Sequence, residues 1–496
     1  MPTGATPPSR SIGPASWRSR RPRSAALALG LWLLGAPQSR AGGTEGGSPG
    51  TAATAEVAAR MIGAALTDGV AHARLTELTD GIGPRLSGSP GAAAAVAWAV
   101  DRFRADGLTV RTEKVLVPHW VRGVERGELV ARPGVAGLTL ALTALGGSGA
   151  TPAEGLTAEV IEVRSLAEVR ALGDRARGKI VLLQHAMSVA SHYGEFGELR
   201  TRGPAEVQKA GGVAALVRSL STASLRAPHT GATMVEAGAP PFPAAALAAE
   251  DADLIHRLLQ KGSVQVRLWL SPRTLPDVES ANVVAEVRGR ERPEEVVVIG
   301  GHLDSWDLGQ GAVDDGAGVV IVMEALRLIA REHPRRTVRG VLFMNEENGL
   351  RGGKTYAIDH AGELSQHVAA LEADAGAGRP LSIQVHGGPG AVDLLRPWMT
   401  PLESFGCDTT TENADAGGAD INPMSKVADP VPMVSVRQDS SRYFDIHHSA
   451  ADTLDKVKPL ELAEAAAAFA WTTWALAEMP RTLPRPAPRA EEKAGK

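Results

Sequence analysis

The second half of the chain alternates short apolar runs with helical patterns, and this alternation constrains the fold more than any other feature. After Pro276, apolar runs occupy residues 296–299, 338–344, 368–371 and 431–436, and helical patterns occupy about 317–331 and 460–478. Short apolar runs of this kind are typical of buried parallel strands. We therefore expect an α/β fold with a doubly wound, mostly parallel sheet and helices on both faces. Functional sites in such sheets lie at the carboxyl ends of the strands.

Five polar clusters follow these predicted strands. They occupy residues 300–306, 311–318, 345–349, 372–376 and 447–453. Together they contain the candidate site residues His302, Asp304, Asp314, Glu346, Glu347, Asp374 and His448. Because the carboxyl ends of parallel strands meet at one edge of a sheet, we expect these side chains to lie close together.

Histidine and carboxylate side chains without cysteine are the donor set of a hydrolytic zinc site. The single cysteine, Cys407, excludes a disulfide framework and a thiolate zinc cluster. Two imidazoles and three carboxylates suffice for two metal ions about 3.5–4 Å apart, with one carboxylate bridging them. Glu346 and Glu347 are adjacent at a strand end, where a bend allows one to bind metal and the other to act as a general base.

Each cluster also has a simpler explanation when it is taken alone. A Gly-Gly-His loop is most often only a loop, and Asp314-Asp315 before a helix suits an N-cap. Paired glutamates after a strand are usually a solvated turn, and His447-His448 suits a surface pair. We favour the joint interpretation because the five clusters occur in order, each at the end of a predicted strand.

These motifs resemble the zinc-dependent exopeptidase family of aminopeptidases and glutamate carboxypeptidases, and most closely its carboxypeptidase Q-like members. Residues 300–318 are similar to the first metal motif of that family, and residues 83–89 and 443–453 also resemble it. The segment 118–123 resembles the entry to an inserted domain, and residues 120–275 are similar to a protease-associated domain. The resemblance covers roughly residues 55–480.

The resemblance implies a role for each candidate. His302 and Asp374 would bind one zinc ion, Glu347 and His448 the other, and Asp314 would bridge both. We choose His448 over His447 because the ligand in the family precedes Ser or Thr. Glu346 would be the general base, and Asp304 would orient His302 through its other ring nitrogen. Three further residues, Trp306, Arg442 and Tyr443, are candidates for the substrate pocket, although packing or a surface contact explains each at least as well.

The implied activity is hydrolysis of terminal peptide bonds of dipeptides or short peptides, with a metal-bridging hydroxide as nucleophile and Glu346 as base. Carboxypeptidase, aminopeptidase and dipeptidase preferences stay open. One alternative is an amidohydrolase that uses the same metal pair on a non-peptide amide. Another is a non-catalytic, receptor-like binding protein, which the complete set of ligand positions disfavours.

The N-terminus predicts a secretory signal peptide over residues 1–41. Arginines at 18–23 precede an apolar run at 25–34, and Ser39-Arg40-Ala41 offers a cleavage site. The apolar run is too short to span a bilayer. We therefore expect a secreted or periplasmic protein that has no membrane partner after signal cleavage.

The remaining sequence divides into four expected parts. Residues 42–117 and 277–480 would form the peptidase domain, residues 118–276 the inserted protease-associated domain, and residues 481–496 a disordered tail. The inserted domain would narrow access to the site or help to form a homodimer.

Charge and composition exclude several partners. The formal net charge is −4, and residues 1–41 hold six Arg and no acid, so the chain from residue 42 carries −4 − 6 = −10. An acidic chain with only 19 aromatic residues (9 Trp, 3 Tyr and 7 Phe) suits neither nucleic acid nor an anionic membrane surface.

Overall fold

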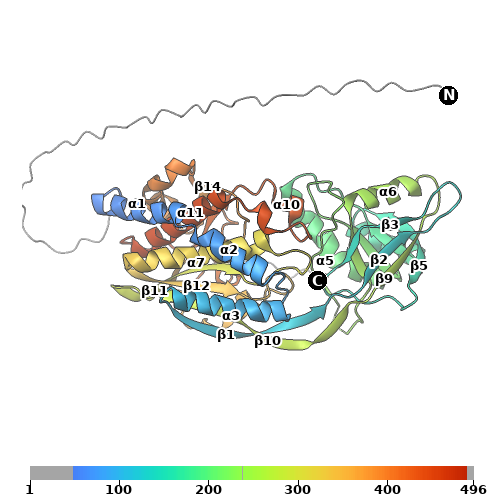
Figure 1. Cartoon of the computed structure of the whole chain (residues 1–496), viewed down its shortest axis with the longest axis horizontal. Coiled ribbons are helices and arrows are strands. Elements are labelled where there is room, and N and C mark those ends of the chain that lie inside the picture. Colours follow the sequence, from blue (N-terminus) through green and yellow to red (C-terminus); the bar gives the residue numbers. More distant parts are fainter. Residues whose placement is uncertain (1–48, 237, 489–496) are drawn as a thin grey trace, which may run out of the picture. The chain divides into compact units, whose positions relative to one another are not determined.

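The computed structural model describes residues 49–236 and 238–488. The predicted signal peptide, residues 1–41, lies outside the described residues. The strands form two eight-stranded sheets, and the polar clusters belong to the first (Figure 1). No helix within the described ranges is long and apolar enough to cross a bilayer.

The first sheet has a parallel centre flanked by antiparallel pairings, and its edge strand β15 pairs in parallel with β14. Its strand order is β1-β10-β12-β11-β13-β16-β14-β15. The central strands β12, β11, β13 and β16 pair in parallel, whereas β1 with β10, β10 with β12, and β14 with β16 are antiparallel. The bounds are β1 Thr109–Val121, β10 Arg273–Val287, β11 Arg292–His302, β12 Arg336–Phe343, β13 His367–Glu372, β14 Pro380–His386, β15 Thr410–Glu412 and β16 Met433–Gln438. The expected α/β fold is confirmed.

Helices cover both faces of this sheet. One face carries α1 (Ala52–Thr67), α2 (Val70–Gly81), α3 (Pro90–Ala105), α7 (Ala317–Ile329) and α11 (Pro459–Glu478), which share one apolar core with the strands. The other face is covered by α8 (Arg351–Asp359), whose Tyr356 packs in a second core with Val298 and Phe343. Helix α7 is apolar and buried over nearly all its length, which is why it packs against β11 and β12. Helices α7 and α11 match the helical patterns expected at about 317–331 and 460–478.

The second sheet is formed by residues that lie between β1 and β10 in the chain. Its strand order is β3-β2-β9-β5-β6-β7-β8-β4. The bounds are β2 Glu125–Leu129, β3 Leu138–Leu140, β4 Leu142–Ala144, β5 Leu156–Val163, β6 Ile180–Leu183, β7 Ala214–Arg218, β8 Ala244–Leu247 and β9 Gln265–Leu270, with helices α4 Leu166–Leu172, α5 Tyr193–Lys209 and α6 Ala249–Leu259. Strand β1 runs past the expected boundary at residue 118, and β10 begins before residue 276. Assignment of this region as a protease-associated domain stays a prediction.

The expected disordered tail is wrong for residues 481–488. Leu483 is buried in the core of the first sheet. Arg485 donates to the carbonyls of Leu364, Ser365 and His367, so this stretch is held by both packing and hydrogen bonds. The proline-, lysine- and glutamate-rich composition of residues 480–496 predicted disorder, but residues 481–488 pack against the first sheet and the segment 364–367. Residues 489–496 lie outside the described residues.

Candidate metal centre

The candidate ligands converge at the carboxyl ends of neighbouring strands. His302 ends β11, Glu346 and Glu347 follow β12, and Asp374 follows β13. Asp314 lies in the helical turn Ala312–Gly316 that leads into α7, and the Asp314–Asp315 peptide bond is cis. His448 follows α10 (Tyr443–Ile446), the short helix after β16. The order β12-β11-β13-β16 in the sheet is what places these loops side by side.

Asp314 stands between the two histidines. Its Oδ1 lies 3.1 Å from His302 Nε2, and its Oδ2 lies 3.4 Å from His448 Nε2. His302 Nε2 is also 3.7 Å from Asp374 Oδ1, and His448 Nε2 is 3.0 Å from Glu347 Oε2. The structure thus brings together all five predicted ligands as two pairs that share one carboxylate.

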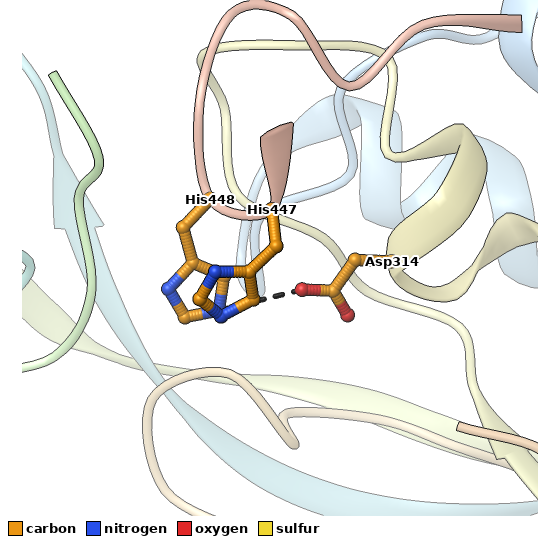
Figure 2. A group of neighbouring side chains, drawn as sticks. All are labelled: Asp314, His447 and His448. Carbon is orange, nitrogen blue, oxygen red and sulfur yellow. Dashed lines mark ion pairs between the residues drawn. The ribbon is translucent and has the colours of Figure 1, made fainter. Parts of the chain in front are cut away.

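The neighbouring histidine, His447, lies beside His448. Their rings stack with centroids 3.7 Å apart, and Figure 2 shows both imidazoles near the Asp314 carboxylate. A nitrogen of each ring and an oxygen of Asp314 lie within 4.8 Å of one another. His447 Nε2, however, lies 3.2 Å from the Tyr193 hydroxyl, whereas His448 Nε2 faces Asp314 and Glu347. This geometry favours His448 as the ligand.

Both candidate histidines face hydrogen-bond acceptors with both ring nitrogens. His302 Nδ1 lies 3.0 Å from the Asp304 carbonyl, and His448 Nδ1 lies 3.2 Å from the Thr230 carbonyl. A ring whose two nitrogens both face acceptors is either doubly protonated, or neutral with a cation between its second nitrogen and the carboxylate. The nitrogen and oxygen donor set therefore fits zinc.

Buried negative charge supports the same conclusion. Burial raises the pKa of Glu347 well above its usual range, and the nearby Asp314 charge adds to this. Burial, together with the charges of Asp374 and Asp314, raises the pKa of Glu346 to about 8. Burial lowers the pKa of His448 to about 3 and keeps it in the neutral form that binds metal. A divalent cation would offset this concentration of acidic groups.

Asp304 does not orient His302 as expected. Its carboxylate Oδ1 lies 3.9 Å from His302 Nδ1, too far for a hydrogen bond, and its backbone carbonyl makes that contact instead. The carboxylate accepts the backbone N–H groups of Asn345 (2.7 Å) and Glu346 (3.1 Å), and the Ser87 hydroxyl (3.0 Å). Asp304 therefore holds the turn that presents Glu346 and Glu347.

The bend after β12 occurs at Asn345, which has a φ of 75°. Asparagine tolerates this left-handed conformation better than most residues. The bend turns the chain directly before Glu346 and Glu347. Such a bend is what the prediction requires, because it assigns Glu346 as the base and Glu347 as a metal ligand. The metal-binding and general-base roles of the six site residues other than Asp304 stay predictions.

Relatives of known family share this architecture. Residues 282–473 match the model of peptidase family M28. Carboxypeptidase Q of Rattus norvegicus is 39% identical over 418 residues, which cover 84% of this chain and 86% of that protein. Carboxypeptidase Q of Homo sapiens is 37% identical over the same length and covers the same shares of both chains. The chain belongs to peptidase family M28.

Two solved structures agree with this membership in the family. The M28 peptidase precursor of Shewanella amazonensis superposes with a TM-score of 0.84 at 37% identity, covering 88% of this chain and 99% of that one. A zinc aminopeptidase of Bacillus subtilis shares the fold, with a TM-score of 0.60 at 19% identity and coverage of 86% and 96%. Membership in M28 confirms the family resemblance and the expected enzyme class, an exopeptidase.

The M28 site also depends on residues to which the sequence had assigned no role. Asp452 accepts the backbone N–H groups of Val313 (2.7 Å) and Asp314 (3.1 Å). Asp315 accepts the backbone N–H of His302 (3.0 Å). Both lie inside polar clusters that the sequence singled out, so their proximity to ligands was the available signal.

Arg85 is a third such residue. Its fully buried guanidinium donates to the carbonyls of Gly83, Leu303, Gln310 and Gly311. It thereby ties the loop at residues 83–89 to the two loops that carry His302 and Asp314. Three of its four partners, Leu303, Gln310 and Gly311, lie more than 200 residues away in the chain, which no local motif reveals.

The three candidates for the substrate pocket lie in different surroundings. Tyr443 and Arg442 line a cavity of about 200 Å³ together with Val313 and Ala375, which adjoin Asp314 and Asp374. Trp306 is buried in an apolar core of the second sheet, although it also borders a small hollow beside Asp314, Glu347 and His448. Packing therefore accounts for most of the Trp306 ring.

Proposed function

We propose that this chain is a secreted or periplasmic di-zinc exopeptidase that hydrolyses terminal peptide bonds of dipeptides or short peptides. The observation that carries the proposal is the position of Asp314, whose two oxygens face His302 and His448 separately. His302 and Asp374 would hold one zinc ion, Glu347 and His448 the other, and Asp314 both. The names of the carboxypeptidase Q relatives support hydrolysis of a terminal peptide bond, and the name of the Bacillus subtilis zinc aminopeptidase supports a zinc-dependent reaction.

Bound zinc supplies Lewis-acid polarisation of the scissile carbonyl and makes a water molecule acidic enough to attack at neutral pH. Glu346 would accept the proton of the attacking water at a carboxylate oxygen and deliver it to the leaving amine. The Asp304 carboxylate would keep Glu346 in place through the backbone of residues 345 and 346. Asp452 would hold Asp314 by accepting its backbone N–H.

The second sheet would restrict access to the site and so favour short substrates. Thr230 and Tyr193 of this region lie against His448 and His447. We propose that residues 118–276 are a protease-associated domain with this role, or with a role in a homodimer interface. Both ideas rest on analogy with the fold family.

The test combines metal content with a substrate panel. The purified mature chain should hold two zinc ions and cleave unblocked dipeptides, and a chelator should abolish cleavage until zinc is restored. Bound zinc with cleavage only of N-acylated amino acids would replace the exopeptidase with an amidohydrolase. A chain that binds no zinc when zinc is supplied would refute the proposed metal centre.

A further inference from the structure

The two metal-facing pairs are supported by different parts of the chain. His302 donates its backbone N–H to Asp315 Oδ2 (3.0 Å), and its Nδ1 contacts the Asp304 carbonyl (3.0 Å). Next to Asp374, Ala373 donates its N–H to the Gly300 carbonyl (2.8 Å) within the first sheet. The position formed by His302 and Asp374 is therefore held by the first sheet and its own loops.

His448, by contrast, is held by Thr230, which lies between β7 and β8 of the second sheet. The Thr230 N–H donates to the His448 carbonyl (2.8 Å), and the Thr230 carbonyl lies 3.2 Å from His448 Nδ1. With the proton on Nδ1, this reciprocal pair fixes both the backbone and the ring of His448. Thr230 is fully buried, so water does not compete for these bonds.

Glu347 also depends on the second sheet, through Trp306. Glu347 Oε1 accepts the backbone N–H of Trp306 (3.1 Å), and the indole of Trp306 packs in a core formed largely by second-sheet residues. A Cβ atom at Gly146, which adjoins β4, would lie only 2.1 Å from this ring. The second-sheet region therefore sets where Trp306 lies and, through it, where Glu347 lies.

Arg122 joins these two supports. Its Nε and Nη2 donate to the carboxylate of Asp307, directly after Trp306, with a shortest contact of 2.6 Å. Its Nη1 donates to the Ala144 carbonyl (2.7 Å), and its Nη2 lies 3.5 Å from Thr230 Oγ1. The Thr230 hydroxyl donates to the same Ala144 carbonyl (2.9 Å). Only 12% of the Arg122 side chain is exposed, so these charge-assisted bonds are largely shielded from water.

We propose that Arg122 is a positioning residue for one metal position only, the one formed by Glu347 and His448. The contacts of Arg122 with Asp307 and Thr230 hold the two supports of that pair. Among residues 49–236 and 238–488, no hydrogen bond from the second sheet reaches His302 or Asp374. The second sheet thus sets the zinc affinity of one position and leaves the other unchanged. This inference rests on the proposed function, because it requires two zinc ions at the site.

The test measures zinc binding directly. Wild-type chain and the variant Arg122→Gln are freed of metal, equilibrated with graded zinc buffers, and analysed for bound zinc. Loss of residues that hold a metal ligand typically lowers metal affinity by about 10–100-fold. Arg122→Gln should therefore lower the affinity for one of the two zinc ions by about that factor and change the affinity for the other by less than about twofold.

A His448→Ala background identifies the position affected. With His448 removed, the remaining zinc would be held by His302 and Asp374. Adding Arg122→Gln to this background should then change zinc affinity by less than about twofold, because Arg122 contacts Asp307 and Thr230 and not the groups that hold His302 and Asp374. An equal loss of affinity in both backgrounds would overturn the inference and indicate a general structural role.

Two further variants guard against misfolding and nonspecific effects. Thr230→Val removes the hydroxyl that contacts Ala144 and Arg122 but keeps the shape of the side chain. It should lower the affinity for the same zinc ion and leave the affinity for the other unchanged. Arg126→Gln removes an exposed arginine of β2 that pairs with Glu128, and it should leave both affinities unchanged. Suppose that the wild-type chain binds two zinc ions and that Arg122→Gln and Thr230→Val each bind two with unchanged affinity. In that case only this inference fails. If wild-type chain never binds two, the proposed function fails instead.

Discussion

The first sheet supplies every predicted metal-facing side chain, whereas the second sheet supplies only contacts that hold some of them. The parallel centre of the first sheet ends in loops that carry His302, Glu347 and Asp374, so the charged groups collect at one edge. The second sheet reaches this edge through Thr230 and Arg122, whose contacts there are mainly with backbone groups and Asp307. The reactive groups therefore come from the first sheet, whereas the positions of His448 and Glu347 depend on contacts with the second sheet.

The largest expected effect lies within the first sheet. Glu346→Ala should lower kcat by about 10²–10⁴-fold, because it removes the group that transfers the proton. Zinc content should stay near two per chain, since Glu346 is not a predicted ligand. Dipeptide hydrolysis and elemental analysis of the same preparation test both parts. Substantial residual turnover would remove Glu346 from its proposed role.

Asp304 should be the next most sensitive position, through stability as well as activity. Asp304→Ala leaves the N–H groups of Asn345 and Glu346 without their carboxylate partner, at about 1–3 kcal/mol for each buried donor. The free energy of unfolding, measured with urea, should fall accordingly.

Ser87→Ala is the matched control for Asp304→Ala. It removes one hydroxyl, which donates to the same carboxylate and accepts from Asn345 Nδ2 (3.0 Å), but it keeps both backbone N–H bonds to Asp304, so it should lower the free energy of unfolding by only about 0.5–1.5 kcal/mol. Equal losses from the two substitutions would show that Asp304 does not hold the Asn345 turn.

Local sequence patterns predicted the central strands and the ligand positions, but they did not predict contacts between residues that are far apart in the chain. Apolar runs followed by polar clusters located all five ligands. His302, Glu347 and Asp374 lie at or just after strand ends, whereas Asp314 lies in the turn before α7 and His448 follows α10.

The sequence patterns did not predict strands β1 and β10, because much of their length is half-exposed and shows no continuous apolar run. Thr230 lies 218 residues from His448 in the chain. It contacts His448 through its backbone, and a backbone contact does not require a particular residue type, so the sequence could not predict it.

Asp304 illustrates the same limit within a motif that was recognised. Its spacing from His302 suggested a carboxylate bound to the imidazole, but the backbone carbonyl makes that contact. The carboxylate binds the turn after β12, because β11 and β12 are parallel neighbours that end side by side. A motif identified the residue, and only the pairing of strands identified its partner.

A core substitution tests whether the two sheets unfold together. Leu182 of β6 is fully buried in the second sheet, and Leu182→Ala should lower the free energy of unfolding by about 2–5 kcal/mol. If the contacts of Arg122 and Thr230 couple the sheets, a single thermal transition should move to lower temperature. Two separate transitions, with only one of them shifted, would show that the sheets are energetically independent.

The smallest expected effect is a pH dependence confined to the first sheet. His360 follows α8, and its ring nitrogens contact Glu113 of β1 and Glu363. Burial disfavours the charged ring, but the hydrogen bonds to Glu113 and Glu363 outweigh it and raise the pKa of His360. Because the folded pKa is the higher one, the stabilisation is complete below the unfolded pKa of about 6.5 and is lost as pH rises through the folded value.

His360→Gln should therefore destabilise the chain more at pH 5.5 than at pH 9, by less than about 1 kcal/mol for such a partly exposed set of charges. Urea unfolding of wild type and variant at both pH values measures the difference. Glu113→Gln should reduce the same pH dependence, because it removes one of the two carboxylates that favour the charged ring. A destabilisation that grows toward pH 9 would contradict the assignment, since a group with a raised pKa stabilises the folded chain only while it is protonated.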